Sequence, residues 1–174
     1  MKIEETLRGC ALLASLAVAA AITGPAAADQ KADRKMLEHG RYLIQVGGCN
    51  DCHTPGYPES GGQMPREQWL TGSPVGFSGP WGTTYPSNLR LTVNAMTEAQ
   101  WLKRARSAMR PPMPGPSLNA MSDQDLRAVY RFIRGLGATG VPAPAYVPPD
   151  QVVVTPYIEF VPKRPAANRQ AANR

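Results

Sequence analysis

The chain has 174 residues, roughly one domain's worth of sequence, and its composition predicts a modest core. It contains 18 Pro and 16 Gly but only 7% aromatic residues, so a domain of this length would gain from apolar mass that its own side chains do not supply. The net charge is +6, yet the Lys and Arg residues are dispersed with no dense run. This dispersal argues against a nucleic acid or an anionic membrane as the partner.

Residues 1–28 have the features of a secretory signal: a charged start, an apolar stretch over residues 11–22 and three alanines at 26–28. The apolar stretch is shorter than the roughly 20 residues that a spanning helix needs. We therefore predict cleavage before Asp29 and no stable membrane span afterwards, with a retained anchor as the alternative. Cleavage would discard Cys10. Export would place the protein in an oxidising compartment, the periplasm if the source is a Gram-negative bacterium.

The first helix is predicted over residues 33–46, and it leads directly into the motif Cys49–His53, whose sequence is CNDCH. Two thiols separated by two residues and followed at once by an imidazole form the attachment pattern of a c-type haem. We predict one haem c, bound covalently through thioethers from Cys49 and Cys52, with His53 as an iron ligand. Nδ1 of His53 should donate to a backbone carbonyl of the following loop, so that Nε2 faces the iron.

A CxxC pair also occurs in thioredoxin-like redox sites, structural disulfides and zinc sites. A structural zinc ion needs four ligands, and outside the motif the chain offers only Cys10 and His39 as Cys or His. A thioredoxin-like pair would follow a strand, but no strand pattern precedes Cys49. The imidazole that directly follows the second thiol favours the haem.

A segment rich in Gly and Pro, residues 54–94, is too long for a structureless loop in a compact domain unless it is functional or packed on something. Its polar donors could bind the haem propionates. The alternative is that the two aromatics belong to the core and the polar residues to the loop surface. The four candidates are Trp81, Tyr85, Asn88 and Arg90.

Two further helices have clear start and stop signals. One is predicted over residues 97–109, opening with Thr97 and Gln100 at capping-box spacing and stopped by two prolines. The other is predicted to begin at Ser122, with two aspartates in its first turn, and to end at Gly135.

The loop between these helices, residues 110–116, presents Met113 among prolines that restrict the backbone. A rigid loop that presents a thioether suits a soft axial ligand, and a His/Met pair raises the haem potential. Alternatively, Met113 fills a gap in the core. His39 would give bis-His ligation and a lower potential, but we interpret it as a surface residue. The competing methionines are Met109, which ranks next, and Met64, Met96 and Met121.

We divide the chain into a signal over residues 1–28, a domain over 29–140 and a Pro-rich C-terminal extension over 141–174. Apolar and aromatic residues lie between the prolines of the extension. A plain linker would lack them, so we expect residues 146–161 to lie extended across the domain or against a partner. Residues 166–174 are expected to be disordered.

From residue 33 to residue 136 the chain resembles the class I c-type cytochromes, which are small mono-haem electron carriers. The resemblance rests on the helix that ends at the haem motif, the Met113 loop and the C-terminal helix. It implies an all-α cytochrome c fold in which three main helices pack around a covalently attached haem. It also implies that the first and last helices cross with Gly40 opposite an aromatic such as Tyr130, and that His53 and Met113 are the proximal and distal ligands.

Residues 79–89, with the sequence GPWGTTYPSNL, are similar to a stretch in cytochrome domains that accept electrons from bacterial dehydrogenases. In those domains Thr-Pro-Asp commonly follows, whereas this chain continues with Arg90-Leu91-Thr92. The resemblance therefore indicates a dehydrogenase without naming one.

These features predict an electron-transfer protein and not an enzyme. It would pass single electrons in the periplasm from a dehydrogenase to an oxidase or other acceptor, either as a free carrier or as the cytochrome subunit of a dehydrogenase complex. Its basic surface would meet acidic docking surfaces on these partners, with an ordinary solvated surface as the alternative. The alternative function is a haem enzyme or a sensor of gas or peroxide with a labile sixth iron ligand. Met113 in its proline-rich loop favours the carrier.

Overall fold

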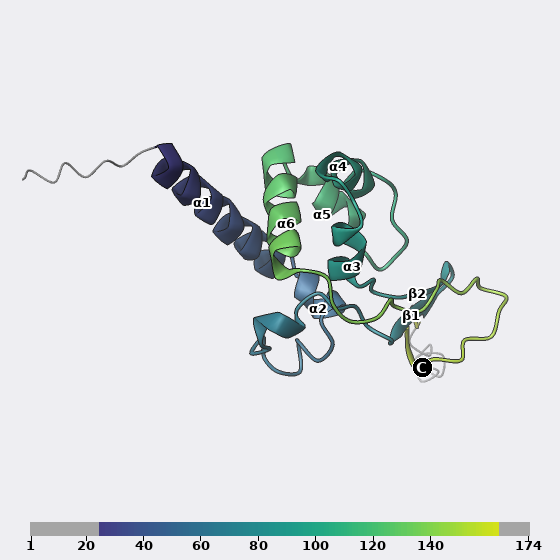
Figure 1. Cartoon of the computed structure of the whole chain (residues 1–174). Coiled ribbons are helices and arrows are strands. Elements are labelled where there is room, and N and C mark those ends of the chain that lie inside the picture. Colours follow the sequence, from purple (N-terminus) through teal and green to yellow (C-terminus); the bar gives the residue numbers. More distant parts are fainter. Residues whose placement is uncertain (1–24, 164–174) are drawn as a thin grey trace, which may run out of the picture.

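The computed structural model describes residues 25–163, which are mostly helical with a small sheet (Figure 1). Residues 1–24 of the predicted signal (1–28) lie outside the described residues, and so does the end predicted to be disordered, residues 166–174. None of the described helices is both long and apolar enough to cross a membrane. The α-helices are α1 (Pro25–Val46), α2 (Cys49–His53), α3 (Leu89–Asn94), α4 (Glu98–Ala105), α5 (Gly115–Ala120) and α6 (Asp123–Leu136), and a short 3₁₀ helix covers Arg66–Gln68.

Helix α1 crosses α6 and packs against it, while the N-terminal part of α1 extends away from the other helices (Figure 1). They approach most closely at Gly40, where an added Cβ atom would lie 2.1 Å from the carbonyl oxygen of Ala128 and 2.8 Å from Cβ of Phe132. The expected close approach at Gly40 opposite an aromatic residue is confirmed, but that residue is Phe132 and not Tyr130. Tyr130 instead turns its hydroxyl to the carbonyl of Met96, at 2.9 Å. The helical core contains Ile44, Trp101, Leu118, Leu126, Val129, Phe132 and Ile133.

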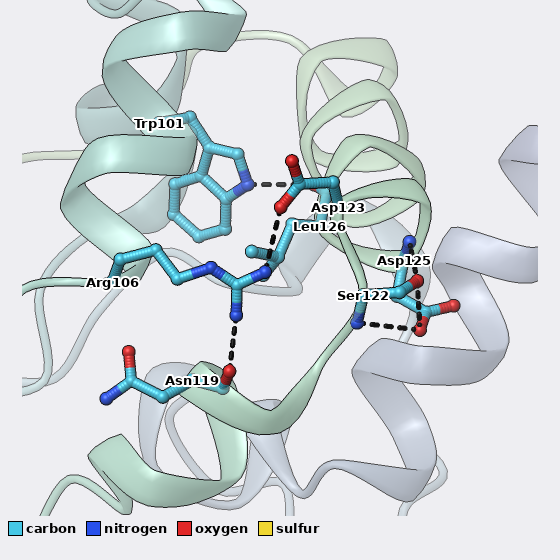
Figure 2. Close-up of polar contacts among 7 residues, drawn as sticks. All are labelled: Trp101, Arg106, Asn119, Ser122, Asp123, Asp125 and Leu126. Atoms are coloured by element: carbon cyan, nitrogen blue, oxygen red, sulfur yellow. Dashed lines mark hydrogen bonds and ion pairs between the residues drawn. The ribbon is translucent and has the colours of Figure 1, made fainter.

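The predicted helix starts at Thr97 and Ser122 are confirmed, because both residues form capping boxes. In Figure 2 the N-terminal turn of α6 carries the box between Ser122 and Asp125. Helix α1 starts at Pro25, earlier than predicted, and α4 stops at Ala105, before the predicted end at residue 109. The early stop of α4 follows a tight turn, in which the amide and the hydroxyl of Ser107 both bind the carbonyl of Arg104.

Side chains of α4 bind the backbone and side chains around the start of α6 (Figure 2). The indole of Trp101 donates to the carbonyl of Leu126 at 2.8 Å. The guanidinium of Arg106 binds the carboxylate of Asp123 at 2.8 Å and also donates to the carbonyl of Asn119, at the end of α5. The contact between Arg106 and Asn119 joins the two ends of the segment 106–119, which contains the Met113 loop.

A small sheet of strands β1 (Gly76–Gly79), β2 (Gly82–Thr84) and β3 (Tyr157–Glu159) corrects the all-α expectation. β1 and β2 form an antiparallel hairpin, and β3 adds to the free side of β1 in parallel. Strands of three or four residues are too short to show an alternating pattern in the sequence.

The segment after α6, residues 141–163, runs back over the hairpin. Val147 and Thr83 exchange both backbone hydrogen bonds, at 2.7 and 3.0 Å. Gly82 has a positive φ of 92°, and a Cβ atom there would lie 2.4 Å from the carbonyl oxygen of Val147, so the close approach requires glycine. The Phe160 ring meets Phe77 and Trp81, with ring centroids 5.7 and 6.4 Å apart. The extension is therefore extended and packed on the hairpin.

Truncation after Gly140 should lower the melting temperature of the haem-loaded protein by about 5–10 °C, because it removes β3 and the Val147 pairing and uncovers Trp81. Thermal unfolding followed by circular dichroism measures this effect. A chain that ends at Lys163 keeps every contact described above and serves as the control. An unchanged melting temperature after truncation at Gly140 would show that the extension contributes nothing to stability.

Replacing Gly40 by Ala should destabilise the protein by about 3 kcal/mol, since the new methyl group meets the backbone of α6. Gly135→Ala is the matched control, because its Cβ would lie 3.7 Å from Leu37 in ordinary contact. That change should be neutral or stabilise by up to about 1 kcal/mol. Guanidinium unfolding of both variants measures the difference, and equal stabilities would contradict the close crossing.

Candidate haem site

The two thiols of the motif lie on α2, one helical turn apart. Gly48 precedes the helix with a φ of 65°, a left-handed conformation that turns the chain from α1 into α2. Both Cys49 and Cys52 are free thiols, and their i, i+3 spacing places them on the same side of the short helix. Two reactive groups on one side, next to a histidine, match the two vinyl groups on one edge of a porphyrin.

The environment of the thiols disfavours the competing interpretations of the CxxC pair. Burial raises the pKa of Cys49 to about 11, with Asp51 adding to the effect, and burial also raises the pKa of Cys52. Thioredoxin-like pairs instead need a lowered thiol pKa, because the thiolate is the nucleophile. Among residues 25–163, no group of three or more His, Cys, Asp or Glu gathers as a zinc site would require.

His53 is held at its ring and at its backbone. Its side chain is buried, with 7% of the residue exposed, and Nδ1 donates to the carbonyl of Ser87 at 2.7 Å. The backbone carbonyl of His53 accepts from the amide of Gly72 at 2.8 Å. A carbonyl can only accept, so the proton sits on Nδ1 and the lone pair on Nε2. Burial lowers the pKa of His53, and the hydrogen bond to Ser87 raises it by a smaller amount. The net lowering favours the neutral imidazole.

Asn88 and Arg90 bind backbone carbonyls around the end of α6. The Asn88 amide donates to the carbonyls of Thr139 and Val141 at 2.8 and 3.1 Å. The Arg90 guanidinium donates to the carbonyls of Glu67 at 2.6 Å and Gly137 at 2.7 Å, and also to that of Leu136. Both side chains therefore fasten the segment of residues 54–94 to the end of α6 and to the residues that follow it.

Trp81 and Tyr85 flank strand β2, and each contacts a different residue of the C-terminal extension. The indole Nε1 of Trp81 is buried and has no hydrogen-bond partner among the described residues. The carbonyl of Trp81 accepts from the hydroxyl of Tyr146 at 2.7 Å, and the Tyr85 hydroxyl pairs with that of Thr155 at 2.6 Å. A buried N–H without a partner is costly, so a water molecule or a bound ligand would have to supply the acceptor.

The Met113 loop is tied to the hairpin and packs on the core. Thr84 donates its hydroxyl to the carbonyl of Pro111 at 2.7 Å, and Met113 is half-buried against the core. Met121 is closer to the motif than its sequence position suggested, because an added Cβ atom on Gly47 would lie 3.7 Å from both the Met121 methyl and Sγ of Cys49. No local sequence signal marks this proximity.

His39 is engaged elsewhere, on the outer side of the crossing. Its Nε2 lies 2.6 Å from a carboxylate oxygen of Asp125, in a partly exposed ion pair between α1 and α6. The bond to His39 is the main cause that lowers the pKa of Asp125. His39 is thus a partly exposed residue paired with Asp125, in agreement with its interpretation as a surface residue.

These residues fit a haem c. Two free thiols share one side of a short helix, a neutral buried histidine keeps a lone pair on Nε2, and a buried indole N–H lacks a partner. The thiols suit covalent attachment, the imidazole suits iron, and the indole suits a carboxylate such as a haem propionate.

Comparison with known proteins supports this fit. The family model described as "Cytochrome c" matches residues 37–137. The alcohol dehydrogenase (quinone), cytochrome c subunit, of Gluconobacter oxydans (strain 621H) is 28% identical over 143 residues, which cover 75% of this chain and 27% of that protein. The gluconate 2-dehydrogenase cytochrome c subunit of Pantoea cypripedii is 27% identical over 120 residues, covering 62% of this chain and 24% of that protein.

The chain thus spans about a quarter of the length of the curated relatives it matches. No solved structure matches it at a significant level. The family model covers more than half of the chain, including the motif, Met113 and most of the helical core. The chain therefore belongs to the cytochrome c family, whose members bind haem c covalently and act in electron transport.

Proposed function

We propose that this cytochrome carries single electrons in the periplasm between a dehydrogenase and a downstream oxidase or other acceptor. In this proposal Cys49 and Cys52 hold the haem, and His53 and Met113 are its axial ligands, as in class I cytochromes. The observation that carries the proposal is the buried His53 directly after the two free thiols, with its tautomer set by the Ser87 carbonyl. The haem, when bound, supplies a one-electron iron couple.

The protein's contribution is to keep the ligands fixed through both oxidation states. His53 is constrained at Nδ1 and at its carbonyl, so its ring has little freedom to turn. The Met113 loop is anchored by Thr84 at one side and closed at its base by Arg106. Ligands that stay in place minimise the rearrangement that accompanies electron transfer. The same anchoring favours a closed, six-coordinate carrier over an enzyme with an open iron.

Of the four residues predicted near the propionates, Trp81 is the strongest candidate. Its indole N–H is buried without a partner and is free to donate to a carboxylate. Tyr85 directly follows strand β2 and shares its hydroxyl with Thr155. Asn88 and Arg90 already donate to backbone carbonyls, so we assign them to holding the loop first.

A group of exposed basic side chains extends from α4 to the start of the Met113 loop, and we propose that it meets acidic surfaces on redox partners. Arg110 stacks on the Tyr146 ring at 4.0 Å and so extends this basic surface toward the hairpin. Charge of one sign near the proposed electron path speeds encounter with oppositely charged partners. The basic surface consists of Lys103, Arg104, Arg106 and Arg110, all exposed.

The relatives supply the argument for the donor. Their printed names describe cytochrome c subunits of alcohol and gluconate dehydrogenases, and the chain resembles about a quarter of each. We propose a dehydrogenase as the electron donor on this basis, with the chain acting either as a carrier or as a docked subunit. The substrate of that dehydrogenase is not implied, because the relatives that this chain matches are cytochrome c subunits.

Replacing Met113 by Ala should abolish the weak sulfur-to-iron band in the near infrared and give a high-spin iron that binds CO rapidly when reduced, since the thioether is lost. Optical spectra of the oxidised and CO-treated reduced proteins measure both effects. Met109→Ala, which removes the next candidate thioether, should keep the band. A band that survives in Met113→Ala would refute Met113 as the ligand, and rapid CO binding by the unchanged protein would favour the sensor or enzyme.

Reversing two basic charges, Lys103→Glu with Arg104→Glu, should slow reduction of ferricyanide by the reduced protein several-fold at low ionic strength, because the anion loses its steering field. Stopped-flow kinetics measure the rate, and the difference should shrink at about 0.5 M salt. Arg34→Glu with Lys35→Glu changes the net charge equally on the exposed N-terminal part of α1 and is the control. Equal slowing in both double variants would show that net charge, and not this surface, sets the rate.

A further inference from the structure

Asn88 is buried next to the acceptor of the His53 bond, and all of its polar side-chain atoms are engaged. Only 2% of the residue is exposed. Both donors of its amide are used on the carbonyls of Thr139 and Val141, and its Oδ1 accepts from the amide of Leu91 at the start of α3. One side chain therefore joins three places: the loop after the hairpin, the first turn of α3 and the chain that leaves α6.

The Ser87 carbonyl that binds His53 belongs to the peptide group that joins Ser87 to Asn88. A peptide group is planar, so the direction of this carbonyl follows the position of the Asn88 nitrogen and Cα. Holding the Asn88 side chain on two sides therefore holds the acceptor of the 2.7 Å bond from Nδ1 of His53. A carbonyl free to rotate would form a weaker bond.

Gly72 lies close to the same peptide. A Cβ atom at Gly72 would lie 2.7 Å from the nitrogen of Asn88 and 3.0 Å from the carbonyl oxygen of Pro86, and its φ of 82° also favours glycine. The Gly72 amide donates to the His53 carbonyl at 2.8 Å. The backbone partner of His53, Gly72, thus lies close to the peptide that accepts from its ring, and the Asn88 side chain ties that peptide to the segment after α6.

We infer that Asn88 is a positioning residue for the axial histidine and that the segment after α6 holds it in place. The inference rests on the proposed role of His53 as iron ligand. A firm bond from Nδ1 to a carbonyl raises the basicity of a ligating imidazole, which favours the oxidised metal. Loosening Asn88 should therefore weaken this effect and raise the reduction potential. The C-terminal segment acts on the haem through Thr139 and Val141 without contacting the iron ligand.

Asn88→Ser in the haem-loaded full chain separates this role from helix capping. Serine is a good N-cap and can still accept from Leu91, but it is too short to donate to the carbonyls of Thr139 and Val141. Those carbonyls belong to exposed residues and can bind water instead, so the variant should fold. Asn94→Ser is the matched control, because Asn94 lies on the same helix and donates only to the carbonyl of Arg90.

The measurements are the midpoint potential and the solvent exchange of the His53 Nδ1 proton, followed by NMR in the reduced protein. Asn88→Ser should raise the potential and speed exchange by on the order of tenfold, which is the effect of losing about one hydrogen bond of protection. Asn94→Ser should change neither. Unchanged potential and exchange in Asn88→Ser, or equal changes in both variants, would overturn the inference.

The result for Asn88→Ser can be interpreted independently of the result for Met113→Ala. The Nδ1 proton reports on Ser87 whichever residue fills the sixth position, so failure of the Met113 proposal does not alter this measurement. If His53 were not a ligand, the reduced protein would lack the ring-current-shifted imidazole resonances of a haem-bound histidine, and the proposed function would fail by that observation alone. Normal ligand resonances with an unchanged Asn88→Ser variant would refute only the role of Asn88.

Discussion

The hydrogen bond from Nδ1 of His53 to the Ser87 carbonyl is the contact on which this site depends. It closes a separation of 34 residues that contains only one short 3₁₀ helix and one hairpin. Such a segment is stable only if its polar backbone groups find partners and its apolar residues are buried. Trp69 and Leu70 supply the burial, since both belong to the same hydrophobic core cluster as the buried side chains of the helices. The loop is therefore part of the core and carries the acceptor for the histidine with it.

Those parts of the fold that depend on local signals were predictable. The capping boxes at Thr97 and Ser122 consist of residues three positions apart, and the sequence alone reveals such pairs. The close approach at Gly40 was also predictable, but through the resemblance to class I cytochromes and not through a local signal. Its partner was not: the residue opposite depends on the rotation of α6, and Ala128 with Phe132 takes the place expected for Tyr130.

The roles of Asn88 and Arg90 could not be read from the sequence, for a specific physical reason. Their partners are backbone carbonyls about 50 residues away, and every residue has a carbonyl. Nothing in the identity of Thr139 or Gly137 marks it as an acceptor. The hairpin and β3 were missed for a related reason, since their pairing uses backbone groups over only three or four residues. Side-chain chemistry, by contrast, identified the motif from five adjacent residues.

Burial has the same effect on three side chains of the motif, Cys49, Cys52 and His53, whose uncharged forms it favours. It raises the thiol pKa values and lowers that of His53, so each group favours its neutral form. With neutral His and Met ligands, the charge that changes in electron transfer would be that of the iron itself. A low-dielectric surrounding penalises the added positive charge of the oxidised state, and the carbonyl of Ser87 opposes that penalty through the imidazole. For a given ligand pair, the balance between burial and this one carbonyl would then adjust the potential, so small structural changes at the peptide between Ser87 and Asn88 would tune function.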